Sequence, residues 1–338
     1  MADDPVETVP PVRRTRLAAV RAAAARQVMA ISWIGVLAGI VVIGAIATYT
    51  APCGCFLTGD NLLTTAQEFS YIAIAALGGA MVIMTRGIDL SVGANMAFTG
   101  LITATLLSRF HLHPVAAVAI GLALGLGAGL LNGLLITVAG MQPFIATLGT
   151  MSVFRGLALV YSQGFTLYPP ASFTALGQGH LGPIPNPFVI LVGLTVLLSA
   201  FLSGTALGRH VYAVGGNEDA ARLLGIEVER VKVFVYVLAG LLGAVGGILL
   251  MSFLGSANPG AATGYELDVI AAAVIGGVSL FGGEGTLFGT VLGAALIQEI
   301  QNVLLLERVP GYWTTLVVGL VILGAIGVDQ VRRRLRRT

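Results

Sequence analysis

Few side chains in this sequence have the types and spacing that catalysis or metal binding requires. His111 and His113, like Cys53 and Cys55, are two residues apart, but neither pair belongs to a larger cluster of ligating residues. No Gly-x-x-x-x-Gly-Lys-Ser/Thr phosphate loop, Gly-x-Ser-x-Gly turn or His-Glu-x-x-His motif occurs. The sequence therefore predicts no metal, no cofactor and no enzymatic activity in this chain, and any ATP would have to be bound elsewhere.

A proton- or sodium-driven carrier usually has ionisable residues inside its membrane spans. Most of the candidates lie near predicted span ends, where snorkelling or interfacial pairing explains them, and Arg155 and Glu299 are the deeper two. The full set is Glu68, Arg86, Asp89, Arg155, Glu284 and Glu299.

The other polar residues inside the apolar runs are mainly uncharged. Mild hydrogen-bonding groups suit a neutral, polyhydroxylated solute, although hydrogen bonding between helices is the simpler role for each one. The candidate solute pathway consists of Ser91, Asn95, Gln142, Phe144, Thr147 and Asn302.

A charged island, residues 208–226, interrupts the apolar sequence and contains a short helix with both ends marked. Asn217 is a natural N-cap, Glu218 and Asp219 place negative charge in the first turn, and Gly225 ends the helix. Two turns of helix are not stable alone in water. The helix must rest on the remainder of this chain or on a partner protein.

The composition is that of a membrane protein. Hydrophobic residues make up 56% of the chain and charged residues 10%, whereas soluble domains carry roughly 25% charge. Long apolar runs predict an all-α, polytopic integral membrane protein, and the alternating segments of a transmembrane β-barrel do not occur.

Basic residues gather in an arm over 1–29, in a loop over 208–230 and in a tail over 329–338. By the positive-inside rule, all three are cytoplasmic. The arm and the tail flank a transmembrane domain over 30–328, and the loop lies within it. Both termini then share one side, which requires an even number of spans. We expect about ten, near 30–50, 62–84, 94–108, 115–138, 143–162, 187–206, 233–254, 269–282, 286–305 and 312–328.

One predicted span is too short for a simple crossing. Fourteen residues over 269–282 cover about 21 Å as a helix, against a hydrocarbon core of about 30 Å. The segment is tilted or re-entrant. Residues 82–93 and 274–285 also echo each other faintly as interrupted spans, and one or two broken helices are expected.

Glycine recurs every four residues in one apolar run, at Gly121, Gly125, Gly129 and Gly133. All four share a helix face and allow another backbone to approach closely. We interpret this face as a packing seam.

Several stretches together resemble the ribose-type monosaccharide permeases, the transmembrane subunits of bacterial sugar ABC importers. The similarity extends over about 30–328, with the motifs in one order. They are Gly87-Ile-Asp-Leu-Ser-Val-Gly93, Gln142-Pro-Phe-Ile-Ala-Thr-Leu-Gly149, Arg155-Gly-Leu-Ala-Leu-Val-Tyr161, the island 208–226, and the run from Gly264 to Gly283.

The resemblance implies a multi-pass protein of the bacterial inner membrane. Its partners would be a cytoplasmic ATPase that binds ATP and magnesium, a periplasmic sugar-binding protein, a second permease copy or paralogue, and a small neutral sugar, with membrane lipid around it and no nucleic acid. The family's coupling helix, which docks on the ATPase, would be formed here by Asn217, Glu218, Asp219, Ala220, Ala221, Arg222 and Gly225.

Two features depart from the family pattern. Cys53-Gly-Cys55 is unusual for it, and Arg86 stands where a small or uncharged residue is expected. Three alternatives stay open: transport of a polyol, furanose, signalling sugar or nucleoside; an ion-coupled secondary carrier; and a membrane scaffold without solute flux.

Overall fold

A computed structural model describes residues 33–51 and 54–311, together with 313, 316–321, 323, 324 and 327. The predicted arm 1–29 and tail 329–338 lie outside the described residues. The described helices are Trp33–Thr50, α2 (Gly59–Met84), α3 (Val92–Ser108), α4 (Pro114–Thr137), α5 (Pro143–Ser162), the short 3₁₀ helix η1 (Ala171–Phe173), α6 (Thr174–Gln178), α7 (Asn186–Gly204), α8 (Ala206–Gly216), α9 (Glu218–Leu223), α10 (Val228–Leu254), α11 (Tyr265–Ile275) and α12 (Leu287–Leu306).

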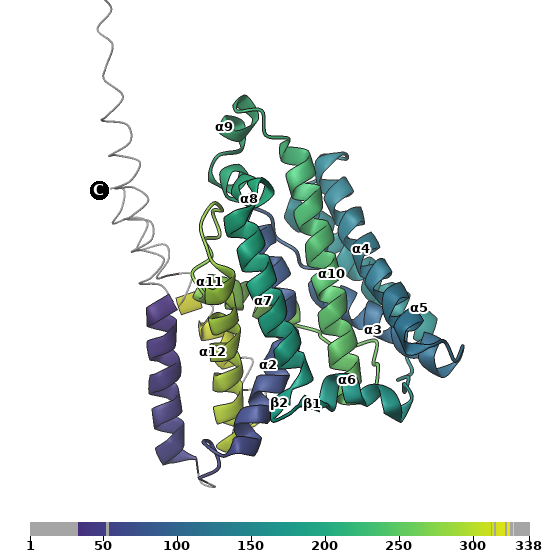
Figure 1. The fold of residues 1–338 in the computed structure, drawn as a ribbon, viewed down its shortest axis with the longest axis vertical. Helices are drawn as coiled ribbons and strands as arrows, with labels where there is room; N and C mark the ends of the chain where they lie inside the picture. The colour runs from purple at the N-terminus through teal and green to yellow at the C-terminus, as the bar shows by residue number, and fades with distance from the viewer. Residues whose placement is uncertain are drawn as a thin grey trace, which may run out of the picture.

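The bundle is almost wholly helical and confirms the all-α, polytopic membrane class (Figure 1). Seven of the described helices are long and apolar enough to cross a membrane. The strands β1 (His180–Leu181) and β2 (Ile184–Pro185) form a small antiparallel hairpin next to α6. We call this end of the bundle the α6 end, and the opposite end, which carries α8 and α9, the α9 end (Figure 1).

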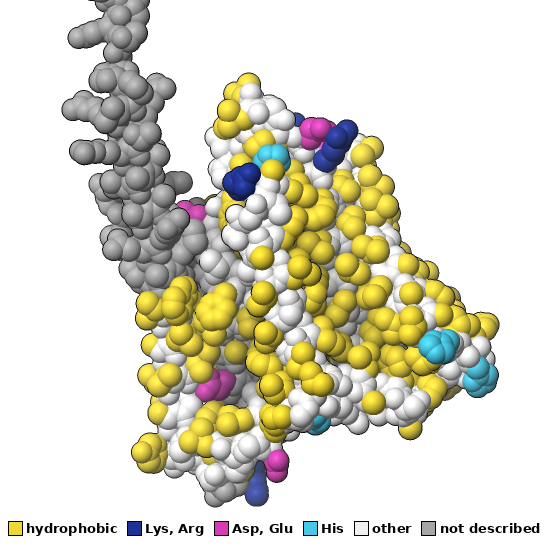
Figure 2. All heavy atoms as spheres, in the orientation of Figure 1, with side chains coloured by type: hydrophobic (Ala, Val, Ile, Leu, Met, Phe, Trp, Pro, Cys, Tyr) yellow, Lys and Arg dark blue, Asp and Glu magenta, His cyan; other side chains and the backbone are white. Residues whose placement is uncertain are grey.

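Two long helices form the centre of the bundle. α2 is buried from Phe69 to its end at Met84, and α10 packs on it closely enough that a Cβ at Gly78 would meet the Cα of Ala239 at 2.7 Å. The other face of α10 receives the glycine seam of α4. On the face of the bundle seen in Figure 2, hydrophobic side chains cover most of the surface between the two ends.

The seam on α4 has the packing role that its spacing predicts. A Cβ at Gly125 would lie 2.6 Å from the carbonyl oxygen of Gly240, and one at Gly129 would lie 2.2 Å from that of Tyr236. Gly127, on the same helix, has no atom within 4 Å of such a Cβ. The close approach of α4 and α10 therefore requires Gly125 and Gly129, but not Gly127.

We expect Gly129→Val to destabilise the protein and Gly127→Val to leave its stability nearly unchanged. Overpacking a tight interface costs about 1–3 kcal/mol, and here the obstacle is backbone, which cannot rotate away. Thermal unfolding of the two purified variants in detergent measures the difference. Equal melting temperatures would show that close packing at Gly129 does not contribute to stability.

The connection between α2 and α3 runs back into the bundle as non-helical chain. α2 ends at the α9 end, where the carbonyl of Met84 accepts from the N–H of Gly283. α3 begins far from that end, because Asn95 in its first turn donates to the carbonyl of Gly240 at 2.9 Å. Gly240 lies 12 residues (240 − 228) into α10, which is about 18 Å of helix. Residues 85–91 run from the end of α2 back to this level of α10.

A second interruption enters from the α6 end. After α10, residues 255–264 run into the bundle, and α11 begins where Tyr265 stacks on Tyr71 with ring centroids 6.4 Å apart. The two helix starts meet, since a Cβ at Gly93 would lie 2.4 Å from the carbonyl oxygen of Ala262. α3 and α11 are thus two short helices that begin inside the bundle and leave it at opposite ends.

The structure corrects the boundaries of the short span predicted over 269–282. The helix begins four residues earlier, at Tyr265, and ends at Ile275. The remaining residues form a loop, 276–286, at the α9 end. Gly276 begins it with an N–H that donates to Ala272, and Gly277, at φ 92°, cannot continue the helix. A charged first turn, with Glu266 and Asp268, hid the start of this helix in the sequence.

Candidate functional site

The short helix α9 has the ends that the sequence predicts. The Asn217 side chain accepts from the N–H of Ala220 at 3.0 Å. At the other end Gly225 has φ 79°, and the N–H of Ile226 donates to the carbonyl of Ala221 at 3.0 Å, as in a Schellman motif. Both ends are closed by residues within the island itself.

Ion pairs fix α9 against the first turns of α10. Glu218 lies 2.9 Å from Arg222 and 2.7 Å from Lys232, and Arg222 lies 2.7 Å from Glu229. Partial burial alone would raise the pKa of the Glu218 carboxyl, but hydrogen bonds and charge from Lys232 and Arg222 outweigh it and hold that pKa below its usual value. The carboxylate therefore stays ionised at neutral pH and keeps both partners.

The tip of α9 exposes apolar surface. Leu223 is 89% exposed and Leu224 is 80% exposed, while Ala221 beneath them is buried and Asp219 and Ala220 face solvent. Hydrophobic side chains are visible at this tip in Figure 2. Two adjacent leucines at a charged, solvent-facing end of the bundle are typical of a contact surface for another protein.

Sequence reasoning missed α8 as a separate helix. Thr205 caps it by accepting from the N–H of Gly208 at 3.0 Å, and Asn217 both ends α8 and begins α9. Tyr212 of α8 donates to the carbonyl of Gly285 at 3.1 Å. The Thr205 cap was the available signal. α8 therefore connects α9 to the 276–286 loop of the bundle.

Two of the pathway candidates lie in a buried polar cluster around residues 88–91. Ser91 donates from its hydroxyl and its N–H to Asp89, at 2.6 and 2.8 Å, and accepts from Asn132 at 2.8 Å. Thr150 then donates to Asn132 at 2.6 Å. Thr147 reaches the same segment by donating to the carbonyl of Ile88 at 3.1 Å. These side chains provide hydrogen-bond partners for the non-helical segment before α3.

Asn95 lies one turn into α3, and its amide nitrogen bonds to Gly240 while its buried amide oxygen has no partner among the described residues. Asn302 is far from this cluster. Its side chain exchanges two hydrogen bonds, of 2.9 and 3.1 Å, with that of Asn61. The structure thus brings Ser91, Asn95 and Thr147 into one region and places Asn302 in another.

Gln142, the N-cap residue of α5, and Phe144, on the exposed side of that helix, both face outward instead. The centre of that side carries small and polar residues: Gly149 and Gly156 have no atom within 4 Å of an added Cβ, and Ser152 between them is exposed. Small residues on an outer face of a membrane helix favour contact with another helix over contact with lipid. We call this surface the α5 face.

Arg155, one of the deeper ionisable residues, binds the backbone of the loop 255–264. One of its terminal nitrogens donates to the carbonyls of Pro259 and Ala261, both at 2.7 Å. The same loop pairs with the α6 end, where Ala257 and Leu167 exchange two backbone hydrogen bonds. Arg155 therefore holds the second interruption in place.

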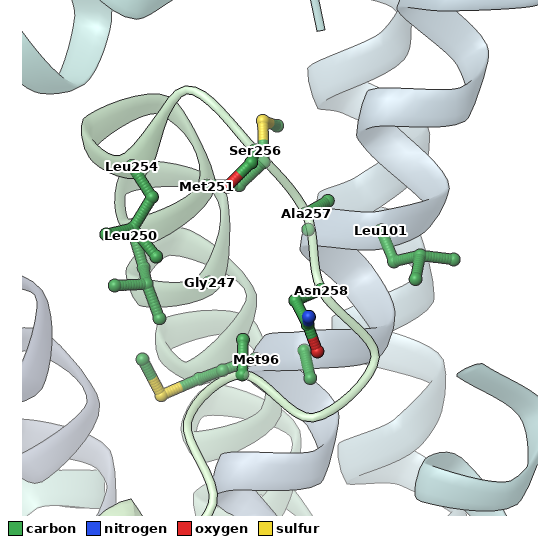
Figure 3. A pocket seen from close by; sticks show the side chains of 12 residues that line it. Met96, Leu101, Gly247, Leu250, Met251, Leu254, Ser256, Ala257 and Asn258 are labelled. Carbon is green, nitrogen blue, oxygen red and sulfur yellow. The ribbon is translucent and has the colours of Figure 1, made fainter. Parts of the chain in front are cut away.

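A small pocket lies under this loop. Figure 3 shows Ser256, Ala257 and Asn258 on the loop that runs between α10, with Leu250 and Leu254, and α3, with Leu101. The walls are mostly apolar, and no charged side chain lines it. Its polar lining residues are Ser256 and Asn258, and the Asn258 side chain already bonds to Thr166 and to the N–H of Gly260.

Two further candidates, His113 and Cys55, have structural roles. The ring nitrogen Nδ1 of His113 accepts from the N–H of Val115 at 3.4 Å and caps α4. Cys55 is disulfide-bonded, and Cys53 lies outside the described residues. Among the described residues, no three His, Cys, Asp or Glu side chains lie close enough to hold a metal ion.

Comparison with known proteins finds similarity to permeases. Residues 61–326 match the family described as branched-chain amino acid transport system / permease component. The chain is 44% identical to the ribose import permease protein RbsC of Bacillus subtilis over 278 residues, 81% of this chain and 86% of that protein. It is 35% identical to the D-allose transport system permease protein AlsC of Escherichia coli (82% and 85% covered) and to the autoinducer 2 import system permease protein LsrC of Salmonella paratyphi B (83% and 83%).

Proposed function

This chain belongs to the sugar permeases of ABC importers, and from that premise we propose that it carries a monosaccharide or similar small polyhydroxylated solute across the inner membrane. It is a transporter subunit rather than an enzyme. ATP and magnesium would be bound by a separate ATPase, and a periplasmic sugar-binding protein would deliver the solute. The allose and autoinducer 2 permeases among its relatives keep other small polar solutes as candidates.

The exposed tip of α9 is the observation that carries the coupling part of the proposal. We assign Asn217, Glu218, Asp219, Ala220, Ala221, Arg222 and Gly225 to a coupling helix that docks on the ATPase. Caps and ion pairs make α9 rigid, and Leu223 and Leu224 supply apolar surface that a groove could bury. A rigid helix of this kind can transmit movement of the ATPase to α8 and α10.

In this proposal the α9 end is cytoplasmic and the chain crosses the membrane ten times. Seven of the crossings are continuous helices among the described residues, and an eighth is the span predicted over 312–328, which the structure describes only in part. The other two combine 85–91 with α3 and 255–264 with α11, each joining irregular chain to a short helix. Irregular backbone at membrane depth is tolerated where it is buried in protein, which agrees with the hydrogen bonds around Ile88 and Pro259.

We propose that the solute passes along the α5 face, between this chain and a second permease copy or paralogue. Gln142 and Phe144 would line its cytoplasmic part. Thr147 faces away from it, so Ser91, Asn95 and Thr147 would contact the solute only if the 85–91 segment moves. Asn302, paired with Asn61, has a structural role in this assignment.

Reconstitution tests the proposal. Proteoliposomes that contain the permease, its ATPase and its binding protein should take up labelled ribose or a related sugar only with ATP, and ionophores should have little effect. Uptake that persists without the ATPase and collapses with an ionophore would identify a secondary carrier. Assembly with the ATPase but no flux of any tested sugar would exclude the proposed solute class.

A further inference from the structure

Arg86 departs from the expected family pattern, and its side chain joins three parts of the α9 end. It follows directly after α2 and Thr85. Its Nε donates to the carbonyl of Phe281 at 2.8 Å, and one terminal nitrogen donates to the carbonyl of Gly216 at 2.6 Å. One guanidinium therefore connects the end of α2, the 276–286 loop and the last residue of α8.

The backbones around Arg86 are packed without space between them. A Cβ at Gly215 would lie 1.7 Å from the carbonyl oxygen of Met84 and 2.5 Å from the nitrogen of Gly283. The N–H of Gly283 also donates to Met84 at 2.9 Å. Because backbone meets backbone here, none of the three segments can shift far without moving the others.

The segments that Arg86 joins continue into the candidate coupling helix α9 on one side and into the first interrupted crossing on the other. Gly216 directly precedes Asn217, which caps α9. Arg86 is the second residue of the non-helical stretch 85–91, which leads to the start of α3. The guanidinium is thus a direct link between the candidate coupling helix and the first interrupted crossing.

We propose that Arg86 is a positioning residue that transmits movement of α9 to the first interrupted crossing, formed by 85–91 with α3, and to the 276–286 loop that follows α11. The inference rests on the proposed function, since it requires α9 to move with an ATPase. Arginine suits the role because its planar fork reaches two carbonyls in different directions, whereas lysine is a single point donor. Both acceptors are backbone carbonyls, which every residue has, so the sequence could not show which residues Arg86 would bind.

The backbone at Arg86 provides a clean substitution. Its φ is 63°, in the left-handed region that glycine adopts without strain. Arg86→Gly therefore removes the guanidinium while the local chain conformation stays favourable. Arg308 is the matched control, because it is also an exposed arginine with positive φ, 56°, and it follows α12 at the α6 end.

The experiment compares sugar uptake per ATP hydrolysed in the reconstituted complex. We expect Arg86→Gly to assemble with the ATPase and hydrolyse ATP within about twofold of wild type while uptake per ATP falls at least about tenfold, since two charge-assisted hydrogen bonds are lost. Arg86→Lys should recover part of the loss, and Arg308→Gly should match wild type.

Two outcomes overturn the inference. In one, uptake per ATP is unchanged in Arg86→Gly. In the other, folded protein, ATPase activity and uptake all fall in proportion, which is the signature of a purely structural role. Failure of the proposed function is recognised separately, because wild-type permease would then show no ATP-dependent uptake at all.

Discussion

Replacing both Leu223 and Leu224 with aspartate should abolish ATP-driven uptake while the permease still inserts and folds. The two side chains are 89% and 80% exposed, so the free permease loses no packing when they are changed. In the proposed complex they are buried in a groove of the ATPase. Burial of one leucine is worth about 1.5–3 kcal/mol, so loss of two weakens docking at least about 100-fold.

Co-purification of the ATPase with the tagged permease measures this directly. The matched control is Leu181→Asp, which changes a leucine of similar exposure, 68%, at the α6 end and should retain the ATPase. If the double variant retains the ATPase at wild-type stoichiometry, α9 is not the coupling helix. A deletion of residues 217–225 should have the same effect as the double aspartate variant.

Gly149→Trp should block sugar uptake and leave ATPase docking intact. A Cβ at this position has no atom within 4 Å, so the indole can be accommodated on the surface of the isolated chain. On the α5 face it would project into the proposed solute path between two permeases. A side chain of this size fills the space that a monosaccharide needs, and we expect uptake to fall by at least about tenfold.

The control is Gly193→Trp in α7, which is also an exposed glycine without a neighbouring atom. If α5 faces only lipid, the two variants will transport equally well, and the proposed path is wrong. Counting permease copies per purified complex separates two explanations for a loss of uptake. A blocked path keeps two copies, whereas a broken subunit contact yields one.

The fold class and α9 could be predicted because their causes are local in the sequence. Apolar runs of span length identify membrane helices from composition alone. Asn217 and the N–H that it accepts from are three residues apart, and Gly225 acts on the turn directly before it. Cap residues work through hydrogen bonds within one turn, so the sequence contains the complete interaction.

The interrupted crossings could be predicted only in part. The sequence marks 269–282 as unusual and pairs 82–93 with 274–285. Those two segments do lie together at the α9 end, where Gly283 bonds to Met84. The second interruption, however, is 255–264, which reads as an ordinary outer loop. Arg155 holds it from more than 100 residues away in the chain.

By itself, the sequence determined the membrane class, the glycine seam on α4 and the capped helix α9, since periodicity and capping act over a few residues. Only the tertiary structure decided that Ser91 and Thr147 support the 88–91 segment, that Asn302 pairs with Asn61 and that Arg86 joins α8 to the 276–286 loop. The physical reason is the same for each. A buried polar group must find a hydrogen-bond partner, and in an interrupted membrane helix that partner comes from whichever distant segment the packing brings within reach.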